Sequence, residues 1–282
     1  MNRLSRHQSQ RFSVLSFNKL LPNMITVMAL CFGMSCLRFA FAERWKFAVG
    51  MILLAAVFDA LDGRMARLLR AQSRFGAELD SLSDFLCFGV VPAVLIFLWS
   101  MIKLQNLGWM VVLFFAICCV LRLARFNVRP EDNEASILAH NYVIGVPAPA
   151  GAGLALLPLI LDFQFYLGLK DTPIFVAIWL IGVGLLMVSH IPTYSFKQIK
   201  LSQGWIVPTL LFSGLITATL ISVPWFTLSI LLILYLSSIP LSLNTYRKLL
   251  IAAEKIAEKM QQDSDNVKAV VDFKANHSNI VD

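Results

Sequence analysis

The chain has 282 residues, of which 58% are apolar and 15% are charged, and its mean hydropathy is +0.72. Soluble globular proteins contain about 45–50% apolar and about 25% charged residues, so too few polar side chains remain here to cover a water-facing surface. The net charge of +7 is typical of loops that set membrane topology and meet anionic lipid, and we expect no nucleic-acid partner. The composition therefore predicts an integral membrane protein.

Hydropathy predicts eight apolar helices. In chain order they cover roughly residues 20–40, 47–63, 82–101, 107–121, 145–165, 173–190, 206–223 and 225–243. The seventh contains no charged residue and approaches the ~20 residues that a spanning helix needs. The alternating pattern of a membrane β-barrel is missing. We therefore predict an all-α polytopic bundle of about eight transmembrane helices.

The regions outside this bundle differ in charge and periodicity. Residues 1–19 are basic and carry apolar side chains among the charges, which predicts an N-terminal interfacial segment. Apolar residues recur at helical spacing among Lys and Glu in 244–262, which predicts an amphipathic cytoplasmic helix. Residues 263–282 have no such period and are expected to be disordered. The transmembrane domain is thus predicted to be 20–243.

The distribution of positive charge predicts the orientation. With a cytoplasmic N-terminus, 19 of the 24 Lys and Arg residues fall on the cytoplasmic side. The five on the other side are Arg38, Arg44, Lys46, Lys103 and Lys170. Such a bias is a strong orientation signal. We therefore expect a multi-pass protein of the cell membrane with both termini in the cytoplasm.

Five acidic residues lie in one otherwise membrane-like stretch: Asp59, Asp62, Glu78, Asp80 and Asp84. An aspartate deep in a membrane helix costs about 2.5–3.5 kcal/mol, so this cluster calls for a function. Asp59 and Asp62 are three residues apart and Asp80 and Asp84 are four apart, and on helices each pair projects from one face. A turn in the basic linker between the pairs would bring all four carboxylates together near the cytoplasmic surface.

Carboxylates in this number suit a hard cation. Oxygen ligands favour Mg²⁺, Mn²⁺ or Ca²⁺ over zinc, and two metals clamping a phosphoryl centre are a well-attested use of such a cluster. The residues that follow Asp62 fit phosphate: Gly63 and Ala66 leave the backbone open, and Arg67 offers a fork of donors.

Taken as one string, these positions resemble the signature of the CDP-alcohol phosphotransferase family. The fixed residues of the string are Asp59, Asp62, Gly63, Ala66, Arg67, Gly76, Asp80 and Asp84. The resemblance implies a membrane enzyme that transfers a phosphatidyl or related group from a CDP-linked donor to an alcohol and releases CMP. It also implies a homodimer.

The resemblance assigns roles residue by residue. It implies that two Mg²⁺ or Mn²⁺ ions are held by Asp59, Asp62, Asp80 and Asp84, with Asp84 also the general base for the acceptor hydroxyl. It implies that the donor, CDP-diacylglycerol, is bound by Gly63, Ala66, Arg67 and Ser73, together with Asn23 and Thr26 of the N-terminal motif at 22–26.

The acceptor is predicted from three further segments. Residues 78–84, 121–127 and 145–150 resemble the phosphatidylserine synthase branch of the family, the integral membrane type, which implies L-serine as acceptor. Serine carries a carboxylate that needs a cation, and we expect Arg122 or Arg125 to provide it, with Asn127 as a further candidate contact.

Two alternatives remain open at this point. The same chemistry could use another acceptor, namely glycerol 3-phosphate, inositol phosphate or choline, because Arg122 and Arg125 could also bind a second phosphate. The chain could instead be an ion or proton transporter, since intramembrane aspartates also mark ion paths. Against a transporter, the acids lie in one helix pair near one face, and no polar relay continues across.

Overall fold

The computed structural model describes residues 17–128, 142–189, 192–194 and 206–240. The chain divides into two units, and each is described by itself. Unit 1 contains residues 1–129 and 147–188, and unit 2 contains 130–146 and 189–282. The predicted amphipathic helix at 244–262 and the tail at 263–282 lie outside the described residues, as do residues 1–16 of the N-terminal segment.

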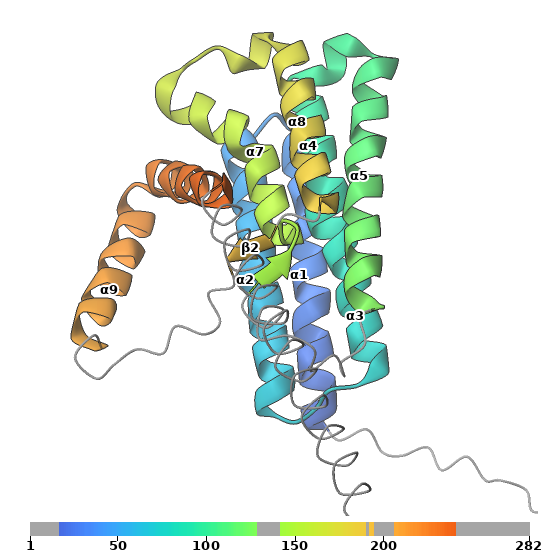
Figure 1. The fold of residues 1–282 in the computed structure, drawn as a ribbon, viewed down its shortest axis with the longest axis vertical. Helices are drawn as coiled ribbons and strands as arrows, with labels where there is room; N and C mark the ends of the chain where they lie inside the picture. The colour runs from blue at the N-terminus through green and yellow to red at the C-terminus, as the bar shows by residue number, and fades with distance from the viewer. Residues whose placement is uncertain (1–16, 129–141, 190–191, 195–205, 241–282) are drawn as a thin grey trace, which may run out of the picture. The chain divides into compact units, whose positions relative to one another are not determined.

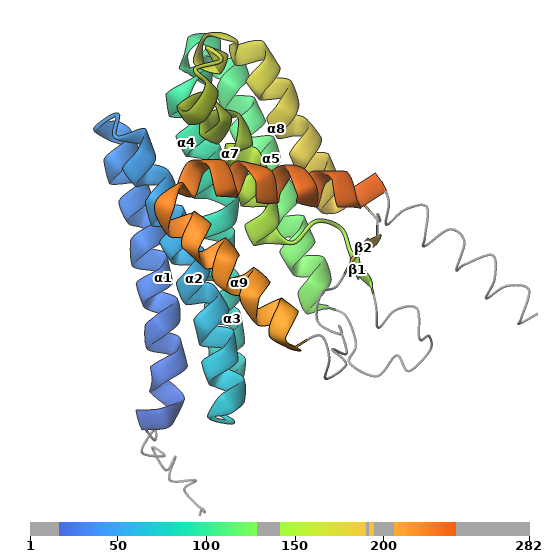
Figure 2. The same cartoon turned by 90° about the vertical axis from the view of Figure 1, so that its left-hand side faces the viewer.

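Unit 1 is a bundle of long helices (Figures 1 and 2). Its elements are α1 (Phe17–Phe41), α2 (Trp45–Leu68), α3 (Arg74–Asp84), η1 (Phe85–Val90), α4 (Val91–Trp99), η2 (Met101–Leu104), α5 (Asn106–Asn127), α7 (Ala148–Phe165), η3 (Leu169–Asp171) and α8 (Pro173–Val188). α1 packs along α2, and α5 packs along α8. The helices agree with the first six predicted apolar segments, apart from their ends.

The third predicted segment is one continuous helical stretch, Arg74–Trp99. It begins after Ser73, whose side chain accepts a hydrogen bond from the Gly76 amide at 3.0 Å and so caps α3. Its middle, η1, is π-helical, and the stretch then continues as α4. The sequence did not predict this π-helical segment.

Side-chain packing holds unit 1 together. Phe88, Leu95, Phe115, Ile160 and Leu180 are fully buried between its helices. Many other large apolar side chains are exposed on the helix surfaces, as expected of helices that face lipid. Among the residues that the structure describes, four stretches are long and apolar enough to cross a membrane: Leu20–Phe41, Arg74–Trp99, Asn106–Asn127 and Ala148–Phe165.

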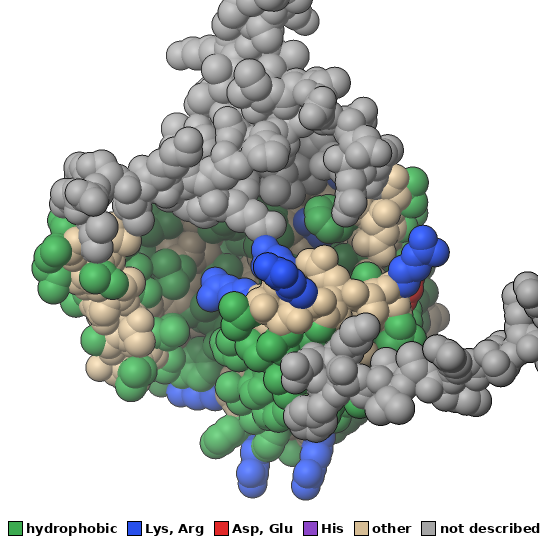
Figure 3. All heavy atoms as spheres, turned by 90° about the horizontal axis from the view of Figure 1, so that it is seen from below, with side chains coloured by type: hydrophobic (Ala, Val, Ile, Leu, Met, Phe, Trp, Pro, Cys, Tyr) green, Lys and Arg blue, Asp and Glu red, His purple; other side chains and the backbone are tan. Residues whose placement is uncertain are grey.

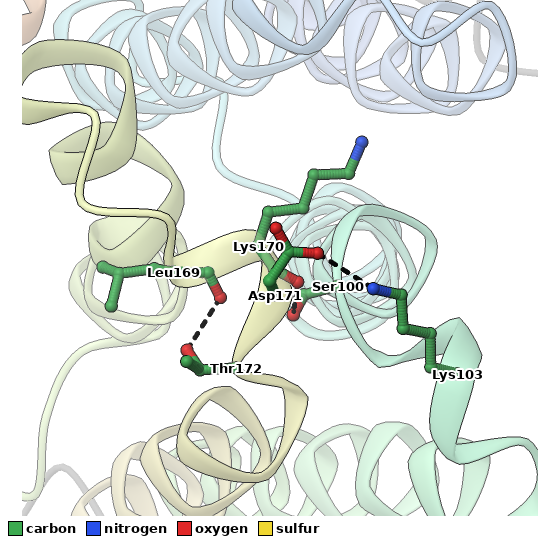
Figure 4. Close-up of polar contacts among 6 residues, drawn as sticks. All are labelled: Ser100, Lys103, Leu169, Lys170, Asp171 and Thr172. Carbon is green, nitrogen blue, oxygen red and sulfur yellow. Dashed lines mark hydrogen bonds and ion pairs between the residues drawn. The ribbon is translucent and has the colours of Figure 1, made fainter.

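Polar contacts tie the loops together where α4 ends and α8 begins (Figure 4). Lys103 donates to Asp171 at 2.9 Å, and the Ser100 hydroxyl donates to the Lys170 carbonyl at 2.9 Å. The Thr172 hydroxyl donates to the carbonyl of Leu169 at 2.9 Å. The hydrogen bond from Lys103 holds the pKa of Asp171 below its usual value.

In its described ranges, 142–146, 189, 192–194 and 206–240, unit 2 contains two short strands and two helices. β1 (Tyr142–Ile144) pairs with β2 (Pro192–Tyr194) in antiparallel register, with Tyr142 opposite Tyr194. α9 (Ile206–Ser222) and the helix Pro224–Pro240 correspond to the last two predicted segments. The strand pair is an addition to the predicted all-α class.

Candidate functional site

Three of the predicted metal ligands converge on one point. Asp59 and Asp62 project from the second half of α2, and Asp80 projects from α3. One carboxylate oxygen from each lies within 4.8 Å of the other two. Asp84, at the last position of α3, lies against Asp59. The structure therefore brings all four carboxylates together, as three clustered groups and a fourth in contact with one of them.

The burial of this cluster fits a bound cation. Asp62 is only 4% exposed, and Asp59, Asp80 and Asp84 are half-buried. Within the described part of the chain, Asp62 Oδ2 and Asp84 Oδ1 are buried and have no hydrogen-bond partner. A buried carboxylate oxygen without a partner is costly, and like charges this close repel each other. A divalent cation with oxygen ligands would satisfy both atoms and neutralise the cluster.

The N-terminal motif lies beside the cluster. Thr26 of α1 is 4% exposed and lies next to Asp62. Its hydroxyl donates to the Pro22 carbonyl at 3.1 Å. Asn23 approaches the start of α3 so closely that a Cβ on Gly76 would lie 2.8 Å from Asn23 Oδ1 and 3.1 Å from Ser73 Oγ. Asn23, Ser73 and Gly76 therefore form one small group of polar and open positions.

The residues after Asp62 remain accessible. A Cβ on Gly63 would meet no atom within 4 Å, so there is open space beside the helix at this point. Arg67 is exposed and its Nε donates to the Gly63 carbonyl at 3.0 Å, which keeps its guanidinium close to this space. Ala66, which lies between Gly63 and Arg67 in the sequence, is half-buried. Figure 3 shows Lys and Arg side chains projecting at this end of the helices.

The predicted acceptor residues lie at the end of α5, and two of them, Arg125 and Asn127, contact neighbouring helices. Arg125 donates from Nη1 to the Val188 carbonyl at 3.1 Å, at the last residue of α8. Asn127 donates from Nδ2 to Ser81 Oγ at 2.9 Å, which links α5 to the residue after Asp80. Arg122 is half-buried one turn before Arg125. Of the predicted acceptor residues, Asn127 thus hydrogen-bonds to α3, the helix that carries Asp80.

The sequence interpretation missed several residues around Asp84. Ser83 and Cys87 are in contact through Oγ and Sγ at 3.9 Å, and the Cys87 thiol donates to the Ala29 carbonyl of α1 at 3.6 Å. Gly33 of α1 faces Cys87 so closely that a Cβ there would overlap Cys87 Sγ. The only sequence signal was the presence of small residues in apolar runs, and that signal does not identify partners on other helices.

Comparison with known sequences shows which family has this arrangement. The profile described as CDP-alcohol phosphatidyltransferase matches residues 19–188, and a second, CDP-alcohol phosphatidyltransferase 2, matches residues 204–240. The chain belongs to the CDP-alcohol phosphatidyltransferase family. The first match contains every carboxylate of the cluster, and the family is generally dependent on divalent metal. Family and apolar helices together indicate an integral membrane protein.

Several relatives in this family share most of their length with the chain. The CDP-diacylglycerol–serine O-phosphatidyltransferase of Mycobacterium tuberculosis is 37% identical over 229 residues, which cover 81% of this chain and 80% of the relative. The enzyme of the same name from Mycobacterium leprae is 34% identical over 94% of this chain and 87% of its own. That of Helicobacter pylori is 31% identical over 70% of this chain and 81% of its own. The resemblance noted from the sequence is confirmed.

Proposed function

We propose that this protein transfers the phosphatidyl group of CDP-diacylglycerol to the hydroxyl of L-serine, giving phosphatidylserine and CMP. The observation that supports this most directly is that Asp59, Asp62 and Asp80 converge and that Asp84 contacts Asp59. All four lie within residues 19–188, which match the family profile. The names of the relatives support both substrates.

The proposed cofactor is a pair of Mg²⁺ or Mn²⁺ ions held by Asp59, Asp62, Asp80 and Asp84. The oxygen-only donor set and the partnerless atoms Asp62 Oδ2 and Asp84 Oδ1 support this choice. When bound, the ions supply charge neutralisation at the pyrophosphate and at the leaving CMP.

Asp84 is the general base of the proposed reaction. Its carboxylate takes the proton of the serine hydroxyl, and the serine oxygen forms a bond to the phosphorus of the phosphatidyl group. The bond from that phosphorus to the CMP oxygen breaks, and CMP leaves with the electron pair. Asp84 suits this role because it lies beside the three-carboxylate group, with one buried oxygen that makes no hydrogen bond to the described residues.

The donor is bound by residues of α1 and α2 and by the N-cap residue of α3. Asn23 and Thr26 of α1 approach from one side, while Gly63, Ala66 and Arg67 of α2 and Ser73 before α3 approach from the others. The open space at Gly63 and the nearby guanidinium of Arg67 support a phosphate contact there. Ser73 would combine this contact with its capping of α3.

The acceptor is bound at the end of α5. Arg122 or Arg125 pairs with the serine carboxylate, and Asn127 lines the same region through its bond to Ser81. Arg125 already donates to the Val188 carbonyl, so it would serve serine with its remaining donors.

The proposed setting is the cell membrane. The chain crosses it about eight times with both termini in the cytoplasm, and the active site opens at the cytoplasmic face. Residues 20–243 form the catalytic domain between the interfacial segment 1–19 and the cytoplasmic helix 244–262, and the protein is a homodimer. The charge bias along the sequence supports the orientation.

An acceptor screen tests the proposal. Purified protein receives CDP-diacylglycerol and Mg²⁺ or Mn²⁺ with serine, glycerol 3-phosphate, inositol phosphate or choline, and the products are identified by mass spectrometry. CMP and phosphatidylserine formed only with serine are the expected result. A lipid product with another acceptor would refute the serine assignment. No CMP with any acceptor, from folded protein, would favour the transporter alternative.

A further inference from the structure

The π-helical segment η1 begins at the residue after Asp84. The Val91 amide donates to the Leu86 carbonyl, five residues earlier, as in a π-helix. Such segments are rare and are frequently found at functional sites. They contain one residue more than a regular α-helix of the same number of turns. One extra residue turns the helix before it by about 100° relative to the helix after it.

Both halves of the Arg74–Trp99 stretch are fixed by separate demands. The first half must present Asp80 and Asp84 to the carboxylates of α2. The second half, α4, is fixed by packing, since Val91, Leu95 and Ile96 are buried against neighbouring helices. A regular α-helix could not meet both demands. With α4 kept in place, it would turn the two aspartates about 100° away from the cluster.

Two close contacts hold the π-helical segment on opposite sides. Gly33 of α1 receives Cys87, and a Cβ at position 33 would overlap Cys87 Sγ and lie 3.2 Å from Cys87 Cβ. Gly89 receives Cys119 of α5, and a Cβ at position 89 would lie 2.9 Å from Cys119 Sγ. The thiol of Cys87 also reaches the Ala29 carbonyl. These contacts leave η1 little room to move sideways.

We propose that the Gly33–Cys87 contact, together with the π-helical segment it holds, positions Asp84 for catalysis. Gly33 and Cys87 are positioning residues that act through Asp84, since neither carries a charged or basic group for the chemistry. This inference rests on the proposed function, because it concerns how Asp84 comes to face the reacting hydroxyl.

Four variants of the full-length protein in lipid nanodiscs test this inference: Gly33→Ala, Cys87→Ala, their combination, and Gly108→Ala as a matched control. Gly108 lies at the other end of the bundle, where an added Cβ would be 2.6 Å from the Met101 carbonyl. It therefore introduces a comparable steric conflict away from the carboxylates. The measurements are kcat, the KM for CDP-diacylglycerol, Mn²⁺ binding by electron paramagnetic resonance, and the unfolding temperature.

Gly33→Ala should lower kcat about ten- to hundredfold, the loss expected for a reacting group displaced by about 1 Å. With Mn²⁺ high enough to fill both sites, the KM for CDP-diacylglycerol should change less than about twofold, because the residues proposed to contact the donor lie elsewhere. Binding of one Mn²⁺ should persist on Asp59, Asp62 and Asp80, while the second should weaken at least about tenfold, as in Asp84→Asn. Cys87→Ala should lower kcat about two- to threefold, because η1 then loses the Gly33 contact but keeps the one between Gly89 and Cys119.

The double variant decides the question. Removing the Cys87 sulfur makes room for the methyl group added at position 33, so Gly33→Ala/Cys87→Ala should recover most of the lost kcat and the second Mn²⁺ site. Gly108→Ala should lower the unfolding temperature and leave kcat within about twofold. The inference is overturned if Gly33→Ala keeps both kcat and the second Mn²⁺ site, if the double variant does not recover, or if Gly108→Ala causes the same kinetic loss.

If Gly33→Ala does not fold, a variant with a smaller steric conflict replaces it. Cys87→Val adds one methyl group toward Gly33 and should give the same split between kcat and KM; a normal kcat would overturn the inference. Failure of this inference can also be distinguished from failure of the proposed function. If the native protein makes no phosphatidylserine, the proposed function fails, while Mn²⁺ binding still reports whether Gly33 positions Asp84.

Discussion

Replacing Asp62 by Asn should have opposite effects on stability with and without metal. Asp62 is the most buried carboxylate of the cluster, and its nearest oxygen lies within 4.8 Å of those of Asp59 and Asp80. At that separation and an effective dielectric constant of about 20, two unit charges repel by about 3.5 kcal/mol. Solvent and relaxation reduce this figure, so we expect Asp62→Asn to stabilise the metal-free protein by about 1–3 kcal/mol.

Thermal unfolding of the purified protein measures this effect. In chelator, Asp62→Asn should melt above the native protein, by roughly 2–4 °C for each kcal/mol. With Mn²⁺ at about 100 times its dissociation constant, the native protein should gain about 2.7 kcal/mol, while the variant gains much less and the order reverses. Asp162→Asn is the control: Asp162 accepts from the Leu169 amide outside the cluster, so its effect should not depend on metal.

A native protein whose unfolding temperature does not respond to Mg²⁺ or Mn²⁺ would refute a metal site at this cluster. An Asp62→Asn variant less stable than the native protein in chelator would show that the carboxylates do not repel one another strongly without a cation.

Three further predictions concern the base, the donor and the loop contacts. Asp84→Asn should lower kcat by about 10²–10⁴-fold and leave donor binding unchanged within about twofold, measured by product formation and calorimetry; a near-normal rate would exclude Asp84 as the base. Arg67→Lys should raise the KM for CDP-diacylglycerol about tenfold, because lysine cannot offer the two parallel donors of a guanidinium. In the control variant Arg64→Lys, this KM should change less than about twofold. Equal effects of the two substitutions would contradict a phosphate contact by Arg67. Lys103→Met should lower the unfolding temperature slightly at pH 7, where Asp171 is charged. The difference from the native protein should vanish as the pH falls below the lowered pKa of Asp171. A difference that persists in acid would show that the substitution removes packing rather than a charge interaction.

The sequence predicted most of the helices because apolar runs alone determine them. Apart from the π-helical segment and the strand pair, its errors lie at the ends of the helices. The second segment was predicted to end at 63, but α2 continues to Leu68, and the helix stops where Arg70 adopts a positive φ of 50°. The hydropathy signal failed there because Asp59, Asp62 and the arginines interrupt the apolar run without interrupting the backbone hydrogen bonds. The start of α3 was readable in principle, since Ser73 is a good N-cap.

The candidate site could be predicted in its residue types but not in its detailed geometry. The spacing of the four aspartates indicated a common face, and the structure groups three of them within 4.8 Å. It could not indicate that Asp84 contacts Asp59 without joining the group of three, because that depends on how α3 lies against α2. Nor could it indicate that Arg125 bonds to Val188, since this contact joins residues 63 positions apart. Contacts between helices distant in sequence leave no local pattern.

The most direct test of the central claim uses L-serine labelled with ¹⁸O in its hydroxyl. Protein, CDP-diacylglycerol and Mn²⁺ are incubated with this serine, and both products are weighed by mass spectrometry. If the serine hydroxyl attacks the phosphatidyl phosphorus, phosphatidylserine carries the label and CMP, formed in equal amount, does not. Unlabelled phosphatidylserine, or CMP released without phosphatidylserine, would contradict the proposed transfer.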